Sequence, residues 1–429
     1  MPELFPFRAL RYDASAVPDL SAVLCPPYDV ISEAERRRLA AHDARNAVHV
    51  ELPVAGDQGG SPYEAAAQTF AAWIADGALQ RDDRPLIYAY EQVFRAADGS
   101  DVAARGFFCR LRLEPYEPGS TVRPHEATMS GPKEDRFRLM SAVKANLSPV
   151  LFLYEDGDLG QTAEALMSEI ASGPPAVEAM GPGGLANRLW LADPAESDSA
   201  RELLRIAGDK PVTIADGHHR YETALRYRDQ AGPSGAADHV LALMYEAQSG
   251  GLSLLPWHRV LTGVDGAALV SAASDWFSVT PCTTAQTMMV RLSESESTGA
   301  RPRGMIGLWT RAGGALLEVD VQRVANLLSS DASETLRWLD VSLLSATLSR
   351  MIGTTSEKLA ADGRLTYLSD AAQAVAQVEA GEADAAFILR PTLIDDVLSV
   401  AAAGEHMPAK STFFHPKAAT GLVFNPLAD

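Results

Sequence analysis

The chain has 429 residues and a formal net charge of −19, from 37 Lys and Arg against 56 Asp and Glu. Because nonspecific binding to nucleic acid or to an anionic membrane depends on basic side chains, this charge argues against both as bulk partners. A hydrophobic content of 47% with 22% charged residues is typical of folded globular domains. The first residues lack the pattern of a signal peptide, and no apolar run approaches the ~20 residues of a membrane span. We therefore expect a cytoplasmic protein whose partner is a small molecule.

Strand-like and helix-like segments alternate along the chain, which predicts an α/β or α+β fold. Apolar residues at helical spacing after Ser61 and Pro62 predict a helix that ends near Gly77. Runs rich in Tyr, Phe and Val predict neighbouring strands over 86–94 and 106–113. Further strands are expected over 150–154, 189–192 and 212–215, and helices over 162–171 and 199–206.

The second half of the chain becomes rich in Ala after residue 261. We therefore predict an N-terminal domain over 1–264 and a smaller C-terminal α/β domain over 265–429. The C-terminal domain is expected to contain strands over 304–309, 315–319, 365–368 and 385–389, with a helix over 371–380.

The most informative segment is IADGHHRYETAL, in which an apolar strand runs into Asp216, Gly217, His218, His219 and Arg220. Backbone N–H groups at a helix N-terminus favour an anion, and an arginine fork matches phosphate or carboxylate oxygens. The glycine allows a ligand to approach the backbone closely. The alternative is a strand–turn–helix junction whose histidines only cap and pack. Because several such residues occur together, we favour an anion-binding site.

A second candidate segment combines VRPHEAT with GPKEDR. Between residues 105 and 144 there are eight Lys or Arg and five Asp or Glu, a local net charge of 8 − 5 = +3. His125 and Glu126 are candidates for a base or a metal ligand, and Lys133 and Arg136 for phosphate contacts. A solvated loop followed by a salt-bridged helix start is an equally good interpretation.

Two further segments carry polar residues, Trp257-His258-Arg259 and the tail motif MPAKST over 407–412. His258 is a ligand candidate, although it also suits a packing role beside Trp257. No Walker glycines precede the Lys-Ser-Thr of the tail, so spacing favours a structural C-terminal strand there. The chain also lacks a P-loop, a GxGxxG fingerprint and a GxSxG nucleophile elbow.

Several of these motifs, in this order, resemble the bacterial and archaeal family called domain of unknown function 1015 (DUF1015). The resemblance covers nearly the whole chain, and ADGHHR is more distantly similar to the nucleotide-contacting box of the ParB/sulfiredoxin-like superfamily, which includes free-serine kinases. This similarity implies a mixed-sheet, nucleotide-binding N-terminal domain, to whose site we expect the MPAKST tail to return. The segments that carry the family resemblance are PPYDVI (26–31), HE (125–126), GPKEDR (131–136), ANLSPV (145–150), ADGHHR (215–220), GEADAAFILRP (381–391) and MPAKST (407–412).

From the motifs and the resemblance we predict a nucleotide-dependent phosphotransferase that uses ATP or ADP with Mg²⁺ on a small hydroxyl-bearing metabolite such as serine. Phosphate contacts are assigned to Gly217, His219, Arg220, Lys133 and Arg136. Catalytic or Mg²⁺-binding roles are assigned to Asp216 and Glu126, the role of base to Glu126 or His218, and substrate contacts to His125, Asn146 and His258.

Two alternatives remain open at this stage. One is a metal-dependent phosphohydrolase that holds Zn²⁺ or Mn²⁺ with nitrogen and oxygen ligands. The other is a nucleotide-binding switch without catalytic activity. The ligands of the hydrolase would come from His125, Glu126, Asp216, His218 and His258.

Overall fold

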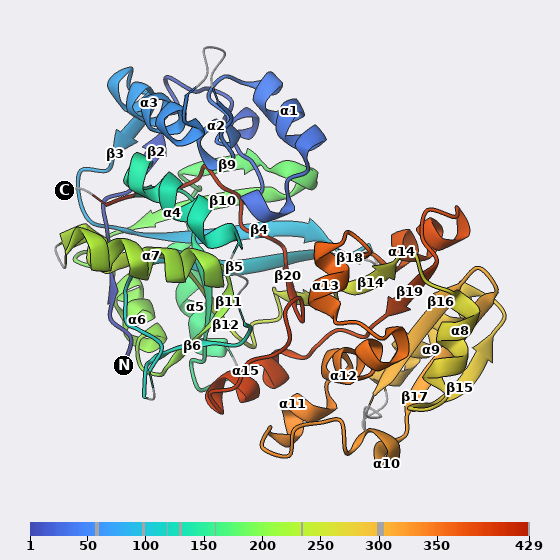
Figure 1. Ribbon diagram of the computed structural model, residues 1–429. Coiled ribbons are helices and arrows are strands. Elements are labelled where there is room, and N and C mark those ends of the chain that lie inside the picture. The colour runs from blue at the N-terminus through green and yellow to red at the C-terminus, as the bar shows by residue number, and fades with distance from the viewer. Residues whose placement is uncertain are drawn as a thin grey trace. The chain divides into compact units, whose positions relative to one another are not determined.

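The computed structural model describes residues 1–55, 60–96, 99–117, 119–127, 131–158, 160–232, 235–297 and 304–427. The chain divides into two compact units, each of which is discontinuous in sequence (Figure 1). Unit 1 comprises Met1–Pro124, Thr128–Ser253 and Pro416–Asp429, and unit 2 comprises His125–Ala127 and Leu254–His415.

The predicted boundary at residue 264 lies inside unit 2. Strand β14 (His258–Leu261) accounts for this difference, because it pairs with β18 (Leu365–Leu368) and β19 (Ala385–Ile388) in the sheet of unit 2. A short crossing segment, His125–Ala127, also belongs to unit 2 although its sequence neighbours belong to unit 1.

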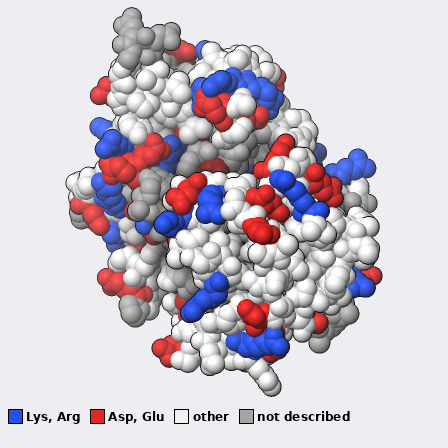
Figure 2. Space-filling view, turned by 45° about the vertical axis from the view of Figure 1, so that its right-hand side comes forward, with Lys and Arg blue, Asp and Glu red and all other residues white. Residues whose placement is uncertain are grey.

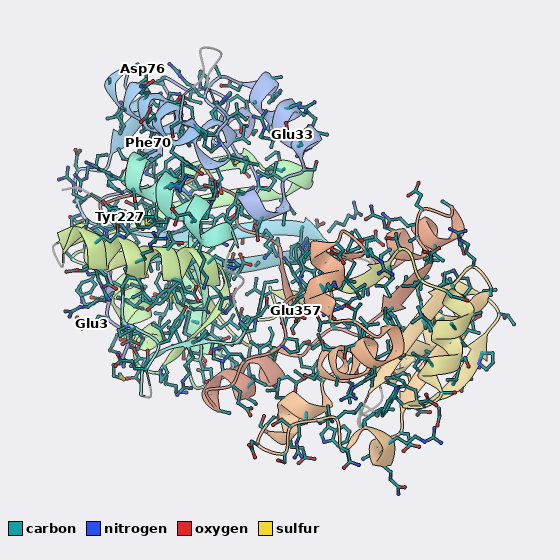
Figure 3. All side chains as sticks on the ribbon, viewed as in Figure 1. Glu3, Glu33, Phe70, Asp76, Tyr227 and Glu357 are labelled. Carbon is teal, nitrogen blue, oxygen red and sulfur yellow. The ribbon has the colours of Figure 1, made fainter. Side chains whose placement is uncertain are left out.

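The last residues of the chain belong to unit 1 and not to the C-terminal domain predicted over 265–429. Phe424 is fully buried, and its ring meets the edge of the Phe70 ring at a centroid distance of 5.4 Å. Phe70 lies on helix α3 (Pro62–Ala75), where Figure 3 labels it. Such a contact between distant segments leaves no periodic signal in the sequence, so composition alone misplaced the end of the second domain.

Unit 1 is built on a large mixed sheet, which confirms the predicted fold class. Its described strands run in the order β6-β11-β8-β12-β5-β4-β10-β9, with β1 paired to β5. The pairs β6–β11 and β8–β12 are parallel. Strands β4 and β5 are neighbours, as their sequences predicted, and they pair antiparallel. The strands are β1 (Leu4–Phe5), β4 (Ile87–Arg95), β5 (Asp101–Arg112), β6 (Val122–Pro124), β8 (Val150–Tyr154), β9 (Val177–Met180), β10 (Ala186–Ala192), β11 (Val212–Asp216) and β12 (His239–Glu246).

The helices of unit 1 bury apolar faces against this sheet or against one another. In α6 (Asp198–Ala207), the Ser197 side chain caps the first turn, and Leu203 and Ile206 are buried. The helix α4 (Gly131–Val143) packs against α7 (His218–Ala231), and both contribute to the candidate site. The remaining α-helices and strands are α1 (Glu33–His42), α2 (Val48–Glu51), α5 (Gln161–Ile170), the paired strands β2 (Leu10–Tyr12) and β3 (Leu79–Arg81), and the paired strands β7 (Ala145–Asn146) and β21 (Asn425–Pro426). Short 3-10 helices lie at Leu20–Ala22, Tyr28–Val30, Pro182–Gly184 and Gly235–Asp238.

Unit 2 contains a second sheet, whose described strands run β15-β17-β16-β19-β14-β18 and pair antiparallel throughout. Val260 of β14 and Val375 and Val378 of α14 (Ala371–Glu379) are part of its core, because both elements turn apolar side chains inward. The other strands are β13 (Ser253–Leu255), β15 (Phe277–Cys282), β16 (Met305–Thr310), β17 (Gly313–Val319) and β20 (Phe413–His415). The other helices are α8 (Gly266–Ala273), α9 (Ala285–Ser297), α10 (Val321–Val324), α11 (Glu334–Trp338), α12 (Asp340–Ile352), α13 (Ser356–Ala361) and α15 (Ile394–Ala402).

Two features concern the partners expected from the sequence, the distribution of charged side chains on the surface and the character of the helices. On the face shown in Figure 2, basic and acidic side chains lie interspersed over the described surface. Within the described ranges, none of the helices combines the length and the apolar character that crossing a membrane requires.

Candidate anion-binding site

The strand β11 leads into α7 through a single glycine, Gly217. Gly217 adopts φ +91°, and a Cβ atom added there would lie 2.9 Å from Nε of Arg220. Both the backbone conformation and the available space therefore favour glycine. Because glycine has no side chain, the first turn of α7 has no side-chain cap from its N-cap residue. The positive end of the helix dipole at this turn favours a negative group.

We expect Gly217→Ala to lower the free energy of unfolding by about 1–2 kcal/mol, because an L side chain is strained at positive φ. Urea denaturation would measure the loss. Gly173 is the matched control, since an added Cβ meets no atom within 4 Å and its φ is not positive. Gly173→Ala should change stability by less than about 0.5 kcal/mol. Equal losses in the two variants would contradict the role of the backbone conformation.

Two cations share the carboxylate of Asp216 at the end of β11. Its Oδ1 accepts a hydrogen bond from Nζ of Lys417, and its Oδ2 accepts one from Nη2 of Arg220. Arg220 also donates from Nη1 to the carbonyl oxygen of Pro149. The three charged groups together carry 2 − 1 = +1.

The ionisation of Asp216 is fixed by its neighbours. Burial alone would raise the pKa of this carboxyl, but Lys417 and Arg220 outweigh burial and hold the pKa well below its ordinary value. Asp216 is therefore ionised at neutral pH and keeps the Arg220 fork in a fixed orientation. Lys417 was absent from the residues predicted for this site, and its main chain is held in unit 1 by a hydrogen bond of 2.9 Å from Nε2 of Gln92 to its carbonyl oxygen.

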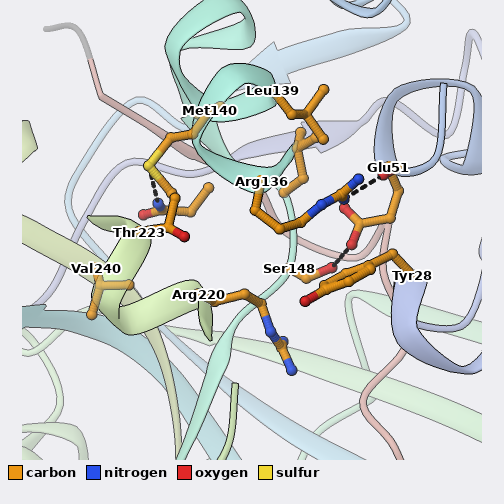
Figure 4. Close-up of a pocket in the computed structure, with 12 residues that line it drawn as sticks. Tyr28, Glu51, Arg136, Leu139, Met140, Ser148, Arg220, Thr223 and Val240 are labelled. Carbon is orange, nitrogen blue, oxygen red and sulfur yellow. Dashed lines mark hydrogen bonds between the residues drawn. The ribbon is translucent and has the colours of Figure 1, made fainter. Parts of the chain in front are cut away.

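A small cavity of about 40 Å³ lies beside Arg220 (Figure 4). The hydroxyl of Thr223 on α7 is buried at this cavity and has no hydrogen-bond partner in the described residues. A cavity of this size holds one or two water molecules, so it is too small for a nucleotide. It is lined by Tyr28, Glu51, Arg136, Leu139, Met140, Ala145, Asn146, Leu147, Ser148, Arg220, Thr223 and Val240.

Arg136 forms one wall of the cavity. Its Nη1 donates to the carbonyl oxygen of Glu51 at 2.7 Å, its Nε donates to Asp135 at 2.8 Å, and its guanidinium lies 4.2 Å from the centroid of the Tyr28 ring. Burial raises the pKa of Tyr28 to about 12, so this phenol is neutral at physiological pH. The carboxylate of Glu51 accepts a hydrogen bond of 2.8 Å from Ser148. Arg136 thus joins α4 to α2 and to the turn that carries Tyr28.

The other residues predicted for unit 1 lie close to this region. Lys133 forms an ion pair with Glu222, which links α4 to α7. Asn146 accepts hydrogen bonds at its Oδ1 from the backbone N–H of Leu241 at 3.0 Å and from Nδ2 of Asn425 at 2.8 Å. Its amide oxygen thus connects β7 with β12 and β21. His218 and His219, the first residues of α7, are both partly exposed.

Three predicted site residues lie in unit 2. His125 contacts the hydroxyl of Thr412 through Nε2 at 2.9 Å, and the backbone N–H of Met407 donates to its carbonyl oxygen at 2.8 Å. The MPAKST segment therefore returns to the His125-Glu126 segment. His258 accepts a hydrogen bond at Nδ1 from the backbone N–H of Leu389 at 3.2 Å. Burial lowers the pKa of His258 to about 4, so this imidazole is neutral at physiological pH.

The carboxylate of Glu126 holds the turn of the MPAKST segment. Its Oε1 and Oε2 accept hydrogen bonds from the backbone N–H groups of Lys410 at 3.0 Å and Ser411 at 3.3 Å. Lys410 adopts a left-handed conformation with φ 60°. A carboxylate bonded to successive N–H groups in this way stabilises a turn, so Glu126 has a structural role in unit 2.

A family model described as protein of unknown function (DUF1015) matches residues 4–342, which is most of the chain. The chain belongs to this family. The family resemblance seen in the motifs is thereby confirmed. No curated protein matches the chain.

Solved structures similar to this DUF1015 protein have low sequence identity to it. A free serine kinase mutant in complex with AMP is 12% identical with a TM-score of 0.39, covering 72% of this chain and 87% of that chain. SbnI with a C-terminal truncation, from Staphylococcus aureus, is 14% identical with a TM-score of 0.37, covering 74% and 87%. A conserved hypothetical protein from Pyrococcus furiosus is 14% identical with a TM-score of 0.36, covering 68% and 87%.

Within the described ranges, the side chains of the DUF1015 protein do not gather into a resident site for Zn²⁺ or Mn²⁺. Among the described residues, no three His, Cys, Asp or Glu side chains are gathered closely enough to hold a metal ion. Both oxygens of Asp216 accept from cations, and both oxygens of Glu126 accept from backbone N–H groups.

Proposed function

We propose that this DUF1015 protein binds the phosphate groups of a nucleotide at the N-terminal end of α7 and transfers a phosphoryl group to a small hydroxyl-bearing metabolite. The observation that carries the proposal is the pair of largely buried cations at this helix end, Lys417 and Arg220, which both bond to the carboxylate of Asp216. A phosphate group placed there gains from the helix dipole and from charge-assisted hydrogen bonds. Gly217 leaves the backbone open to close approach.

Phosphoryl transfer depends mainly on positioning and on electrostatic stabilisation, which are the contributions that these residues offer. Asp216 orients the Arg220 fork, and Lys417 supplies a second cation for oxygens that gain charge in the transition state. Of the two predicted bases, His218 begins the same helix, whereas Glu126 is hydrogen-bonded in unit 2. His218 is therefore the candidate that the geometry of unit 1 supports. Mg²⁺ would arrive with the nucleotide, since it usually keeps several waters and needs only one or two carboxylates.

Nucleotide binding is tested by thermal unfolding with ATP, ADP or AMP, each with and without Mg²⁺. A ligand that binds the folded state raises its stability by about 2.7 kcal/mol at a concentration 100 times its Kd. We expect one nucleotide to stabilise the wild-type protein selectively. Arg220→Ala and Lys417→Ala should each weaken its affinity about tenfold or more, because each removes charge-assisted hydrogen bonds.

Arg205 provides the matched control for these variants. It lies on α6 in the same unit, and its 60% exposed side chain pairs with Glu202. Arg205→Ala should leave nucleotide affinity unchanged. If no nucleotide shifts the unfolding of the wild-type protein, the proposal is wrong, and if Arg220→Ala and Lys417→Ala bind as wild type does, the site lies elsewhere.

Transfer is tested separately, with γ-labelled ATP and a panel of small hydroxyl compounds that begins with serine. We expect a labelled monophosphate ester in the wild-type reaction and a large loss of turnover in His218→Ala, with nucleotide affinity retained. Binding without transfer to any compound of the panel would instead support the nucleotide-binding switch.

A further inference from the structure

Arg259 is a buried arginine in unit 2 that the predicted chemistry does not use. It lies on β14, and only 5% of the residue is exposed. Its Nη1 donates a hydrogen bond to the carbonyl oxygen of Trp257. In the described part of the chain, no carboxylate lies within ion-pair distance of this guanidinium. Four of its five N–H groups thus lack a protein acceptor there.

The environment of Arg259 compensates its charge only partly. The ring centroid of Tyr367 lies 5.3 Å away, and the charge of Glu126 acts favourably from a greater distance. Burial nevertheless dominates and lowers the pKa of Arg259 to about 10. By contrast Arg390, which is also buried in unit 2, forms two hydrogen bonds of 2.7 Å with Asp340. A buried guanidinium without such a partner is costly, and it would be stabilised by an anion from solution.

Further groups that suit an anionic ligand surround Arg259. Tyr367 stands opposite Arg259 on β18, and Trp257, whose carbonyl oxygen accepts from Arg259, lies two residues before it. The Nζ of Lys410 lies 4.8 Å from the centroid of the Trp257 ring. The indole N–H of Trp257 donates to the carbonyl oxygen of Thr412 at 3.0 Å, which fixes the ring beside the turn that carries Lys410.

The charge of one carboxylate, Glu126, acts on Arg259, and that of another, Glu357, acts on Tyr367. Glu126 is bonded to the backbone N–H groups of Lys410 and Ser411, so its oxygens are engaged in the turn. Glu357, labelled on α13 in Figure 3, acts electrostatically on Tyr367. Neither carboxylate forms an ion pair with Arg259. The remaining N–H groups of its guanidinium can therefore donate to the oxygens of a ligand.

We propose that Arg259 and Lys410 bind the oxyanion group, carboxylate or phosphate, of a small metabolite in unit 2. The planar fork of Arg259 matches two oxygens of either group, and Lys410 adds a second positive charge. Trp257 and Tyr367 flank the group with aromatic surface. Arg259 and Lys410 belong to unit 2, whereas Arg220 and Lys417 at the start of α7 belong to unit 1.

Isothermal titration of the full chain with inorganic phosphate, and separately with acetate, tests the proposal. We expect saturable binding of at least one of the two, and the tighter one identifies the chemical group. Arg259→Met, which removes the charge and keeps the length of the side chain, should weaken binding tenfold or more. Arg259→Lys should also weaken it, because it retains the charge but loses the fork. Lys410→Met provides a second test should the changes at Arg259 prevent folding.

Two control variants separate this site from other cations. Arg311 is 57% exposed on unit 2 near Asp384, so Arg311→Met should bind as wild type does. Arg220→Ala removes the cation proposed to bind nucleotide in unit 1 and should leave the unit 2 site intact. Unchanged binding in both Arg259→Met and Lys410→Met would overturn the proposal. So would loss of all binding in Arg220→Ala alone, or no binding of either anion to the wild-type protein.

Discussion

Asp216→Ala is expected to lower the free energy of unfolding by about 3–5 kcal/mol, because breaking a buried ion pair by removing one member is strongly destabilising. In the folded protein Arg220 and Lys417 both donate to this carboxylate. Their side chains are each 12% exposed and that of Asp216 is 18% exposed, so water replaces the lost partner poorly. Urea denaturation followed by circular dichroism at neutral pH would measure the loss.

The pH dependence of the same variant tests the cause. Lys417 and Arg220 outweigh the effect of burial and keep the pKa of Asp216 in the folded protein well below its ordinary value of about 3.9. A group with a lowered folded pKa contributes stability above its unfolded pKa, and this contribution disappears as the pH falls toward the folded pKa. The wild-type protein should lose this contribution progressively below about pH 5, and Asp216→Ala should lack that part of the profile.

Glu202→Ala is the control for this prediction. Glu202 pairs with Arg205 on the surface of α6, where the two side chains are 42% and 60% exposed. Because exposed ion pairs contribute little to stability, this change should have a small effect. A loss in Glu202→Ala as large as that in Asp216→Ala would show that the Asp216 ion pairs behave like surface pairs.

Local sequence patterns were sufficient to locate many elements of the fold. The strands expected over 150–154 and 365–368 are observed with the same bounds as β8 and β18. The helix α3 begins at Pro62, as the Ser-Pro pair predicted. These elements are defined by short apolar runs and by proline at a helix start, so the information needed to find them lies within a few residues.

The composition of the candidate site depends on contacts between distant segments. Lys417 follows Asp216 by 201 positions, and no periodicity connects the two. In the tail, spacing favoured a strand, but β20 covers only Phe413–His415, and the preceding Lys410 and Ser411 bind Glu126 through their backbone. The residue types in a motif indicate which side chains can form ion pairs or hydrogen bonds. Only the fold determines which of these side chains contact one another.

Residue type alone also does not separate arginines that remain available to a ligand from those that hold the structure together. Arg136 was predicted to contact phosphate, and its donors are bonded to the Glu51 carbonyl and to Asp135. Arg390 occurs in a family motif with no indication of a partner in the sequence, and it forms the buried ion pair of unit 2. The difference lies in the acceptors that the fold places around each guanidinium.

Arg390→Met and Asp340→Leu are each expected to destabilise the protein by about 3–5 kcal/mol, because breaking a buried ion pair by removing one member is strongly destabilising. The two side chains are 2% and 5% exposed and are joined by two N–H···O hydrogen bonds of 2.7 Å. Asp340 also accepts from the backbone N–H of Met305 at 3.3 Å, so it connects α12 to β16. Denaturant unfolding of the two variants would measure the losses.

The double variant tests whether those losses of stability come from breaking the ion pair or from poorer packing of the replaced side chains. Arg390→Met with Asp340→Leu places apolar groups on both sides, and replacing a whole buried pair in this way is often neutral or stabilising. We therefore expect the double variant to be more stable than either single variant. The exposed pair of Arg311 with Asp384 is the matched control. A double-mutant cycle on that pair should give an interaction free energy of at most about 1 kcal/mol. Additive losses in the buried pair would mean that each side chain acts through its own packing, because two side chains that stabilise the protein through their mutual ion pair give non-additive losses.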